Sequence, residues 1–241
     1  MKTSLFIAVV LLAGAIGGLV QGLVNLAIVE PFLASAINVE NQNLFKSGEE
    51  KDTPDFWVKY YSYRVWQKNG EVLAGTILGV GIGSLFGLVF GLSRNSLPSN
   101  NFIKKALLLA LIMWATLYVI PFAKYPANPP TVGEPDTLVL RQTLYVGFIA
   151  ISGLGALGFY QVYKRTDRKI IAFIGYAVLI GVAYFMMPQN PDPVNVDSGL
   201  LAGFRATSMI GVTSFWVTAA LVLGALWKKL NLEQVSQTRY K

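Results

Sequence analysis

The sequence predicts an all-α integral membrane protein with six transmembrane helices, arranged as three helix hairpins, with both termini in the cytoplasm. Mean hydropathy is +0.50, and 14% of the 241 residues are charged, well below the roughly 25% of soluble domains. Several apolar stretches approach or exceed the about 20 residues that cross a bilayer as a helix. Basic residues gather in alternate connections between these stretches.

Six stretches carry this prediction, at about 5–29, 72–92, 105–123, 143–163, 170–187 and 206–227. Only helices and closed barrels satisfy their backbone in lipid, and continuous apolar runs without period-two alternation exclude a barrel. Little sequence remains between the stretches, so residues 1–241 are predicted to form a single polytopic membrane domain. The first stretch could begin as a signal peptide cleaved near Ala15. Its apolar run continues to Val29, which favours a retained helix.

The distribution of charge predicts the orientation. With the N-terminus inside, the inner segments hold twelve cations and two acids, whereas the outer segments hold eight cations and eleven acids. This excess of inner cations follows the positive-inside rule. The net charge of +7 therefore reflects topology and contact with anionic lipid, without a nucleic-acid partner. A multi-pass protein of the plasma membrane is predicted.

Cysteine and histidine are absent from the sequence. Disulfides, thiolate and imidazole metal sites and histidine-based acid–base catalysis are therefore excluded. No Walker lysine motif and no nucleophile–base pair is visible, so an enzyme is not predicted. No cofactor is predicted in the chain, although a weakly bound divalent metal such as Co²⁺ remains a candidate substrate.

Glycines at spacing four mark the first two helices. This spacing keeps residues on one helix face, and glycine lets two backbones approach closely in lipid. We expect these faces to pack together, most simply helix 1 against helix 2. The residues are Gly14, Gly18, Gly22, Gly75, Gly79, Gly83, Gly87 and Gly91.

The connection over residues 30–70 is the longest predicted outer segment. Its second half predicts a helix over about 54–69, with Thr53 as N-cap, Pro54 at the first position and Gly70 past the end. Its many aromatic residues favour a helix at the outer membrane interface. A platform for carbohydrate or nucleobases is the alternative.

A proline-rich turn occurs twice, as PANPPTVGEPDTLVLRQT at 126–143 and PQNPDPVNVDSGLLAGFRAT at 188–207. A weaker copy runs from Glu30-Pro31 to Arg64. Each copy reaches an arginine near its end, and Gln142 directly follows Arg141. We hypothesise that Arg64, Arg141 and Arg205 brace an outer vestibule by pairing with loop carboxylates. In the simpler alternative they snorkel to lipid head groups.

Oxygen donors surround these turns. Carboxylate and amide oxygens suit hard or borderline divalent ions, but the same groups also serve as solvated loop charges. The candidate metal ligands are Glu40, Glu134, Asp136, Asp192 and Asp197. Other polar or soft candidates are Glu30, Asn128, Asn190, Asn195, Met186 and Met187, with Gln21 and Asn25 either as interhelical glue or lining a polar path.

These features together resemble the CbtA family of predicted cobalt transporter subunits, over nearly the whole chain. The resemblance rests on the glycine-rich first helices, Pro31 with the acidic stretch to Glu40, Pro121…Pro129-Pro130…Gly133, Arg141-Gln142, Pro188…Pro191, and Arg205 with SFWVTAALVLG. Family members commonly carry histidine near the ends of helices 3 and 5, where this sequence has Tyr118 and Tyr184. The resemblance implies cobalt uptake linked to cobalamin synthesis.

The sequence therefore predicts a CbtA-like permease component for uptake of a divalent metal, cobalt in the first place. The alternative is a non-transporting accessory subunit of a larger membrane complex. Expected partners are the lipid bilayer and other membrane subunits, among them the small single-helix, histidine-bearing partner that the resemblance implies.

Overall fold

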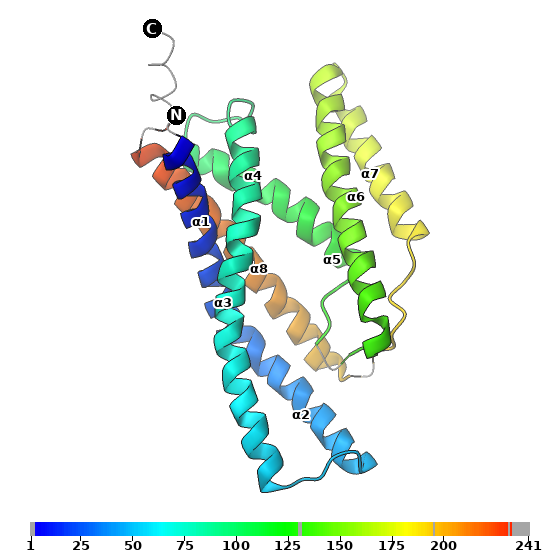
Figure 1. Ribbon diagram of the computed structural model, residues 1–241. Coiled ribbons are helices and arrows are strands. Elements are labelled where there is room, and N and C mark those ends of the chain that lie inside the picture. The colour runs from blue at the N-terminus through cyan, green and yellow to red at the C-terminus, as the bar shows by residue number, and fades with distance from the viewer. Residues whose placement is uncertain (1–2, 130–131, 195, 231, 233–241) are drawn as a thin grey trace. The chain divides into compact units, whose positions relative to one another are not determined.

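The computed structural model describes residues 3–129, 132–194, 196–230 and 232 (Figure 1). In this part, six helical segments are long and apolar enough to cross a membrane. Their bounds are Thr3–Ser47, Pro54–Ser93, Phe102–Lys124, Pro135–Arg165, Lys169–Met186 and Ser198–Lys229. The prediction of an all-helical protein with six such helices is confirmed.

The individual elements subdivide these segments. They are α1 (Thr3–Val24), the π-helical turn η1 (Asn25–Val29), α2 (Glu30–Ser47), α3 (Pro54–Ser93), α4 (Phe102–Trp114), the π-helical turn η2 (Ala115–Val119), α5 (Ile120–Lys124), the 3-10 turn η3 (Pro135–Thr137), α6 (Leu138–Arg165), α7 (Lys169–Met186) and α8 (Ser198–Lys229). The chain divides into two compact units, residues 1–111 with 202–241 and residues 112–201.

The first unit is built on a glycine seam between α1 and α3. A Cβ added to Gly14 would lie 2.5 Å from the carbonyl oxygen of Gly79, and one added to Gly79 would lie 2.6 Å from that of Gly14. Gly18 and Gly83 approach the partner backbone equally closely. Only glycine permits this approach, which supplies van der Waals contact where lipid provides no hydrophobic driving force.

Helix α8 packs on the same unit through aromatic rings. Phe215 lies against Gly17, where an added Cβ would meet its ring at 3.0 Å. Trp227 is 1% exposed and packs edge-on to Phe90, with ring centroids 5.1 Å apart. These contacts hold the last long helix against the first two.

Two prolines that the sequence marks as helix exits lie inside helices. Proline lacks an N–H and clashes with the carbonyl four residues before it. A π turn precedes both Pro31 and Pro121. In a π turn the N–H bonds to the carbonyl five residues earlier and not four, as the N–H of Glu30 does to the oxygen of Asn25. The helix therefore passes Pro31 and continues to Ser47. The third copy of the proline turn, expected at Glu30-Pro31, is thus a bulged helix and not a turn.

The aromatic segment 54–69 is the beginning of α3 and not a separate helix. Thr53 caps it as expected, its hydroxyl accepting from the N–H of Phe56 at 3.3 Å. The helix then runs through Gly70 to Ser93. A glycine inside a helix costs only about 1 kcal/mol, so one glycine is not enough to end a long helix. At 1.5 Å per residue, α3 extends about 60 Å, twice the hydrocarbon core.

The second unit contains α5, η2, α6 and α7. Its helices meet at Ser152, which is 0% exposed. The Ser152 hydroxyl donates to the Thr116 carbonyl in η2 at 2.6 Å and lies 2.8 Å from the Tyr176 hydroxyl on α7. One small side chain therefore links three elements of the unit.

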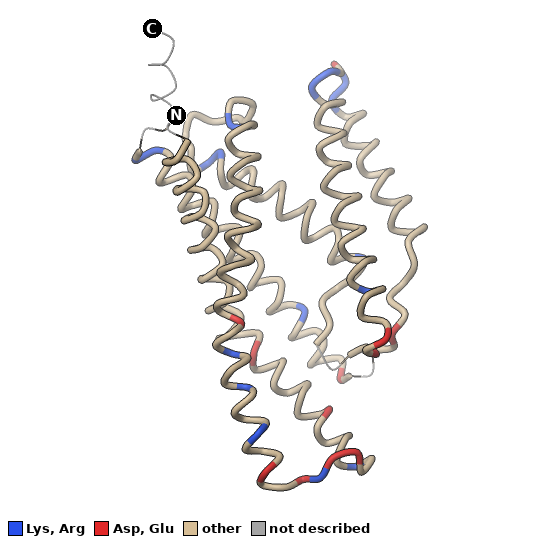
Figure 2. Tube along the Cα trace, viewed as in Figure 1, with Lys and Arg blue, Asp and Glu red and all other residues tan. Residues whose placement is uncertain are grey.

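Charged residues gather at turns between helices, and further charged residues lie along α3, among them Arg64, Lys68 and Glu71 (Figure 2). The turn between α6 and α7 is basic, with Arg165, Arg168 and Lys169, and the turn between α2 and α3 carries Glu49, Glu50 and Asp52.

Candidate functional site

A buried ion pair joins the first two long helical segments. Arg64 on α3 donates to the Glu30 carboxylate at 2.5 Å, and both side chains are 8% exposed. The π turn positions Glu30, because it rotates the first residue of α2 relative to α1. Charged groups in membrane-crossing helices are costly and are usually functional, so this pair is the first candidate site.

Further polar groups extend the pair into a cluster. Lys68 lies 3.1 Å from the same Glu30 oxygen, and the Gln67 side-chain oxygen accepts from Arg64 at 2.5 Å. Glu71 interacts electrostatically with both Glu30 and Arg64 and by a side-chain hydrogen bond with Asn25, the first residue of η1. We call Asn25, Glu30, Arg64, Lys68 and Glu71 the polar cluster.

The polar cluster holds two carboxylates and two cations. Its formal charge is therefore balanced, which lowers the penalty of burying these groups. Asn25 also reaches α8, because its side-chain oxygen lies against Gly211 and is buried without a hydrogen-bond donor among the described residues. The cluster thus contacts three long helices of the first unit.

A second ion pair lies in the second unit, between the two proline-rich loops. The Arg141 Nε is 2.8 Å from a carboxylate oxygen of Asp192, whose side chain is 3% exposed. The guanidinium also donates to the carbonyl oxygens of Val132 and Glu134, at 3.4 and 3.1 Å. Thr137 donates to the same carboxylate at 2.7 Å.

Local backbone geometry makes room for this pair. Gly133 has φ of +111°, in a region that favours glycine. A Cβ there would lie 2.5 Å from the Asp192 carboxylate and 2.6 Å from Arg141 Nη1. A second link joins the loops, since the Tyr125 hydroxyl donates to the Pro188 carbonyl at 2.6 Å. The two copies of the proline turn are therefore bonded to each other.

The other predicted residues lie on or next to α6 and α8. Arg205 lies two turns inside α8 and is partly buried, because α8 begins at Ser198 and not near residue 206. Gln142 is exposed on α6. Asp197 accepts from the N–H groups of Gly199 and Leu200 at 2.8 and 3.0 Å and so caps the start of α8.

The predicted metal ligands differ in exposure and in their partners. Glu40, Glu134 and Asp136 are exposed, and Asp192 is engaged by Arg141. Across residues 3–129, 132–194, 196–230 and 232, no three histidine, cysteine or acidic side chains lie together in a way that could hold a metal ion. Asn190 accepts from the Asp192 N–H at 3.2 Å. Asn195 lies outside the described residues.

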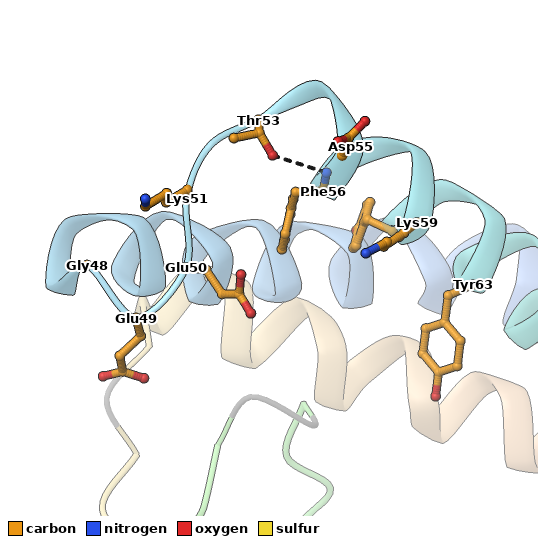
Figure 3. A pocket seen from close by; sticks show the side chains of 10 residues that line it. Gly48, Glu49, Glu50, Lys51, Thr53, Asp55, Phe56, Lys59 and Tyr63 are labelled. Atoms are coloured by element: carbon orange, nitrogen blue, oxygen red, sulfur yellow. Dashed lines mark hydrogen bonds between the residues drawn. The ribbon is translucent and has the colours of Figure 1, made fainter.

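A hollow lies beside the turn between α2 and α3 (Figure 3). The Thr53 hydroxyl accepts from the N–H of Phe56 at its rim. Its charged lining consists of three acidic and two basic side chains. The lining residues are Gly48, Glu49, Glu50, Lys51, Thr53, Asp55, Phe56, Lys59, Tyr60 and Tyr63.

Two members of the polar cluster, Lys68 and Glu71, were not anticipated from the sequence. The available signal is helical spacing, because Arg64, Lys68 and Glu71 follow one another at four and three residues and so share one helix face. Ending the predicted helix at Gly70 separates Glu71 from that face. Continuing the helix through Gly70 would have revealed it.

The six helices and the buried ion pairs define a multi-pass membrane protein with charged groups held inside its helical units. A family model described as "Probable cobalt transporter subunit (CbtA)" matches residues 3–228. The chain belongs to this family, which is a family of transporter subunits and not of enzymes. Searches of curated proteins and of solved structures gave no significant match.

Proposed function

We propose that the chain is the permease component of a system that takes up divalent metal, with cobalt as substrate, across the plasma membrane. Family membership, six membrane-length helices and the excess of inner cations support this proposal. In it, the helices form three hairpins of a single polytopic domain with cytoplasmic termini. Other membrane subunits complete the system, consistent with the word "subunit" in the family description.

The observation that carries the proposal is the buried Glu30–Arg64 pair at 2.5 Å, extended by Lys68 and Glu71. Ionisable groups at such positions commonly mark ion pathways. At rest, the cations of Arg64 and Lys68 neutralise the carboxylates. A divalent cation with retained waters competes with these tethered cations for the same oxygens, since carboxylates suit such ions.

In the second unit, we propose that Arg141 fixes the proline-rich loops as one wall of an outer vestibule. The support is the set of bonds from its guanidinium to Asp192, Val132 and Glu134. The exposed carboxylates of Glu134 and Asp136 on these loops raise the local concentration of cations. Arg205 and Gln142 belong to the same hypothesis through their place in the repeated sequence pattern.

Radioactive cobalt accumulation in cells that lack their own cobalt uptake tests the proposal. Glu30→Gln keeps the size of the side chain and removes its charge, so accumulation is expected to fall at least tenfold while the protein still inserts. Glu49→Gln, in the exposed turn that follows the same helix, is the matched control and should accumulate cobalt normally. Equal accumulation by both variants would contradict the role of Glu30.

A charge-swapped variant separates transport from folding. Glu30→Arg with Arg64→Glu keeps an ion pair and moves its carboxylate to α3. If Glu30 only stabilises the fold, the swap restores cobalt accumulation to the inserted protein. If the carboxylate must lie next to the π turn to handle the cation, the swapped protein inserts and accumulates no cobalt.

An accessory, non-transporting subunit is the second candidate. It is favoured by the family description as a subunit, and by the finding that the described residues contain no three-acid cluster. Purified protein in liposomes distinguishes the two, because a permease component moves radioactive cobalt across the bilayer and an accessory subunit alone does not. Glu30→Gln liposomes provide the background rate.

A further inference from the structure

A buried lysine without a hydrogen-bond acceptor lies at the end of α5. Lys124 is 6% exposed, and its Nζ has no hydrogen-bond partner among the described residues. An ammonium group carries three donors and a full charge, and burying it unpaired is strongly unfavourable. Neither cobalt uptake nor the two ion pairs described above accounts for this residue.

The chain contains acids nearby in sequence that do not pair with Lys124. The two proline-rich loops carry Glu134, Asp136, Asp192 and Asp197. Asp192 pairs with Arg141, Asp197 caps α8, and the other two are exposed. No ion pair to Lys124 forms among the described residues, and an acceptor supplied from outside the chain would satisfy its charge.

Aromatic rings surround the ammonium instead. Nζ lies 4.8 Å from the centre of the Tyr184 ring and 5.8 Å from that of Tyr125. Lys169 offers a direct comparison, since its Nζ also lies 4.8 Å from a tyrosine ring, that of Tyr163. Lys169 is exposed and donates to the Tyr163 carbonyl at 2.7 Å. Lys169 therefore combines a tyrosine ring with an acceptor, whereas Lys124 has rings without an acceptor among the described residues.

The position of Lys124 indicates the kind of acceptor. It is the last residue of one membrane-length helical segment, and Tyr184 lies two residues before the end of another. Helix ends with lysine and tyrosine commonly lie at the depth of lipid head groups, where the abundant anion is phosphate. A phosphate offers several charged oxygens to one ammonium.

We propose that Lys124 binds an anionic phosphate group, from a lipid head group or from free phosphate, in the place now covered by the Tyr184 ring. Tyr184 is 36% exposed, so its ring can turn outward into solvent or lipid without leaving a buried space. Charge-assisted hydrogen bonds to phosphate then replace a weaker cation–π contact. Tyr184 serves as a cover over the ammonium when no phosphate is bound.

Thermal unfolding of the full chain in a phosphate-free maltoside detergent tests this proposal, followed through the fluorescence of its 5 tryptophans. Three probes are compared at equal ionic strength: phosphatidylglycerol, phosphatidylcholine and inorganic phosphate. Phosphatidylglycerol is expected to raise the midpoint by about 2–4 °C, the shift typical of a modest stabilisation in a chain of this size. A rise with inorganic phosphate as well identifies free phosphate as a ligand, and a rise with phosphatidylglycerol alone identifies the lipid.

Variants connect the response to the residue. Lys124→Gln is expected to abolish the rise, whereas Lys169→Gln, the matched lysine over a tyrosine ring, keeps it. Lys124→Met replaces a buried charge by an apolar chain of similar length, so it is expected to fold at least as stably as the wild type without lipid and to lose the response. The proposal fails if phosphatidylglycerol does not stabilise the wild type, or stabilises Lys124→Met equally.

Discussion

Arg141 and Asp192 lie 2.8 Å apart and join two loops that are more than 50 residues apart in sequence. The pair explains the repeated proline-rich turn, since each copy supplies one partner. We predict that Arg141→Lys lowers the free energy of unfolding by about 1–3 kcal/mol, because lysine keeps the charge and loses the forked contacts. Thermal unfolding in detergent measures this, with the exposed Arg165→Lys as control. Equal midpoints for the two variants would show that the fork does not matter.

The glycine seam predicts a position-dependent effect of leucine. Gly83→Leu places a side chain against the backbone of Gly14, whereas a Cβ at Gly81 meets nothing within 4 Å. Gly83→Leu is therefore expected to destabilise the purified protein by about 2 kcal/mol or more, as overpacking does. Gly81→Leu should leave the unfolding midpoint nearly unchanged. Similar losses in both variants would contradict the seam.

Ser152 supplies a third test, within the second unit. Ser152→Ala leaves the Thr116 carbonyl and the Tyr176 hydroxyl without their shared partner, which is expected to cost about 1–3 kcal/mol. Ser93→Ala is the control, because the Ser93 hydroxyl donates only to the Val89 carbonyl of its own helix at 2.7 Å. Denaturation in detergent should separate the two variants clearly. If they unfold together, the link through Ser152 adds nothing to stability.

The orientation of the chain is open to direct labelling, since the sequence contains no cysteine. We predict that Ser47→Cys and Ser198→Cys react with an impermeant maleimide in intact cells. Ser96→Cys and Thr166→Cys are expected to react only after permeabilisation, because the inner segments carry the excess of basic residues. Labelling of Thr166→Cys in intact cells would overturn the proposed cytoplasmic termini.

Hydropathy was sufficient to predict six helices, because lipid leaves the backbone few alternatives. The ends of the helices were harder to predict. The sequence predicts a helix exit at Pro31. The preceding π turn changes the hydrogen-bond pattern so that the helix tolerates a residue without an N–H, and the helix continues to Ser47. Gly70 was interpreted as a helix end, but it lies inside α3. The low helix propensity of one glycine is a weak effect, and the tertiary contacts of a long helix can override it.

The two ion pairs show what sequence alone can say about a site. Arg64 and Arg141 stood out because an arginine beside an apolar run needs a partner. Their partners are Glu30 and Asp192. Nothing in the sequence distinguishes these two acids from the other acids of the predicted loops. Choosing between them requires knowing which segments meet in space, and a single sequence does not contain that information.

The first unit is interrupted in sequence, and this has a consequence for biogenesis. Helices α1 and α3 can join along their glycines as soon as both have entered the bilayer, since they are neighbours in the chain. Helix α8 is made last, and it supplies Phe215 and Trp227 to the same unit. The surface of α1 and α3 that α8 contacts therefore stays open to lipid while residues 112–201 are synthesised and inserted. A chain truncated before α8 would expose this surface, and it is the form that we expect membrane quality control to remove.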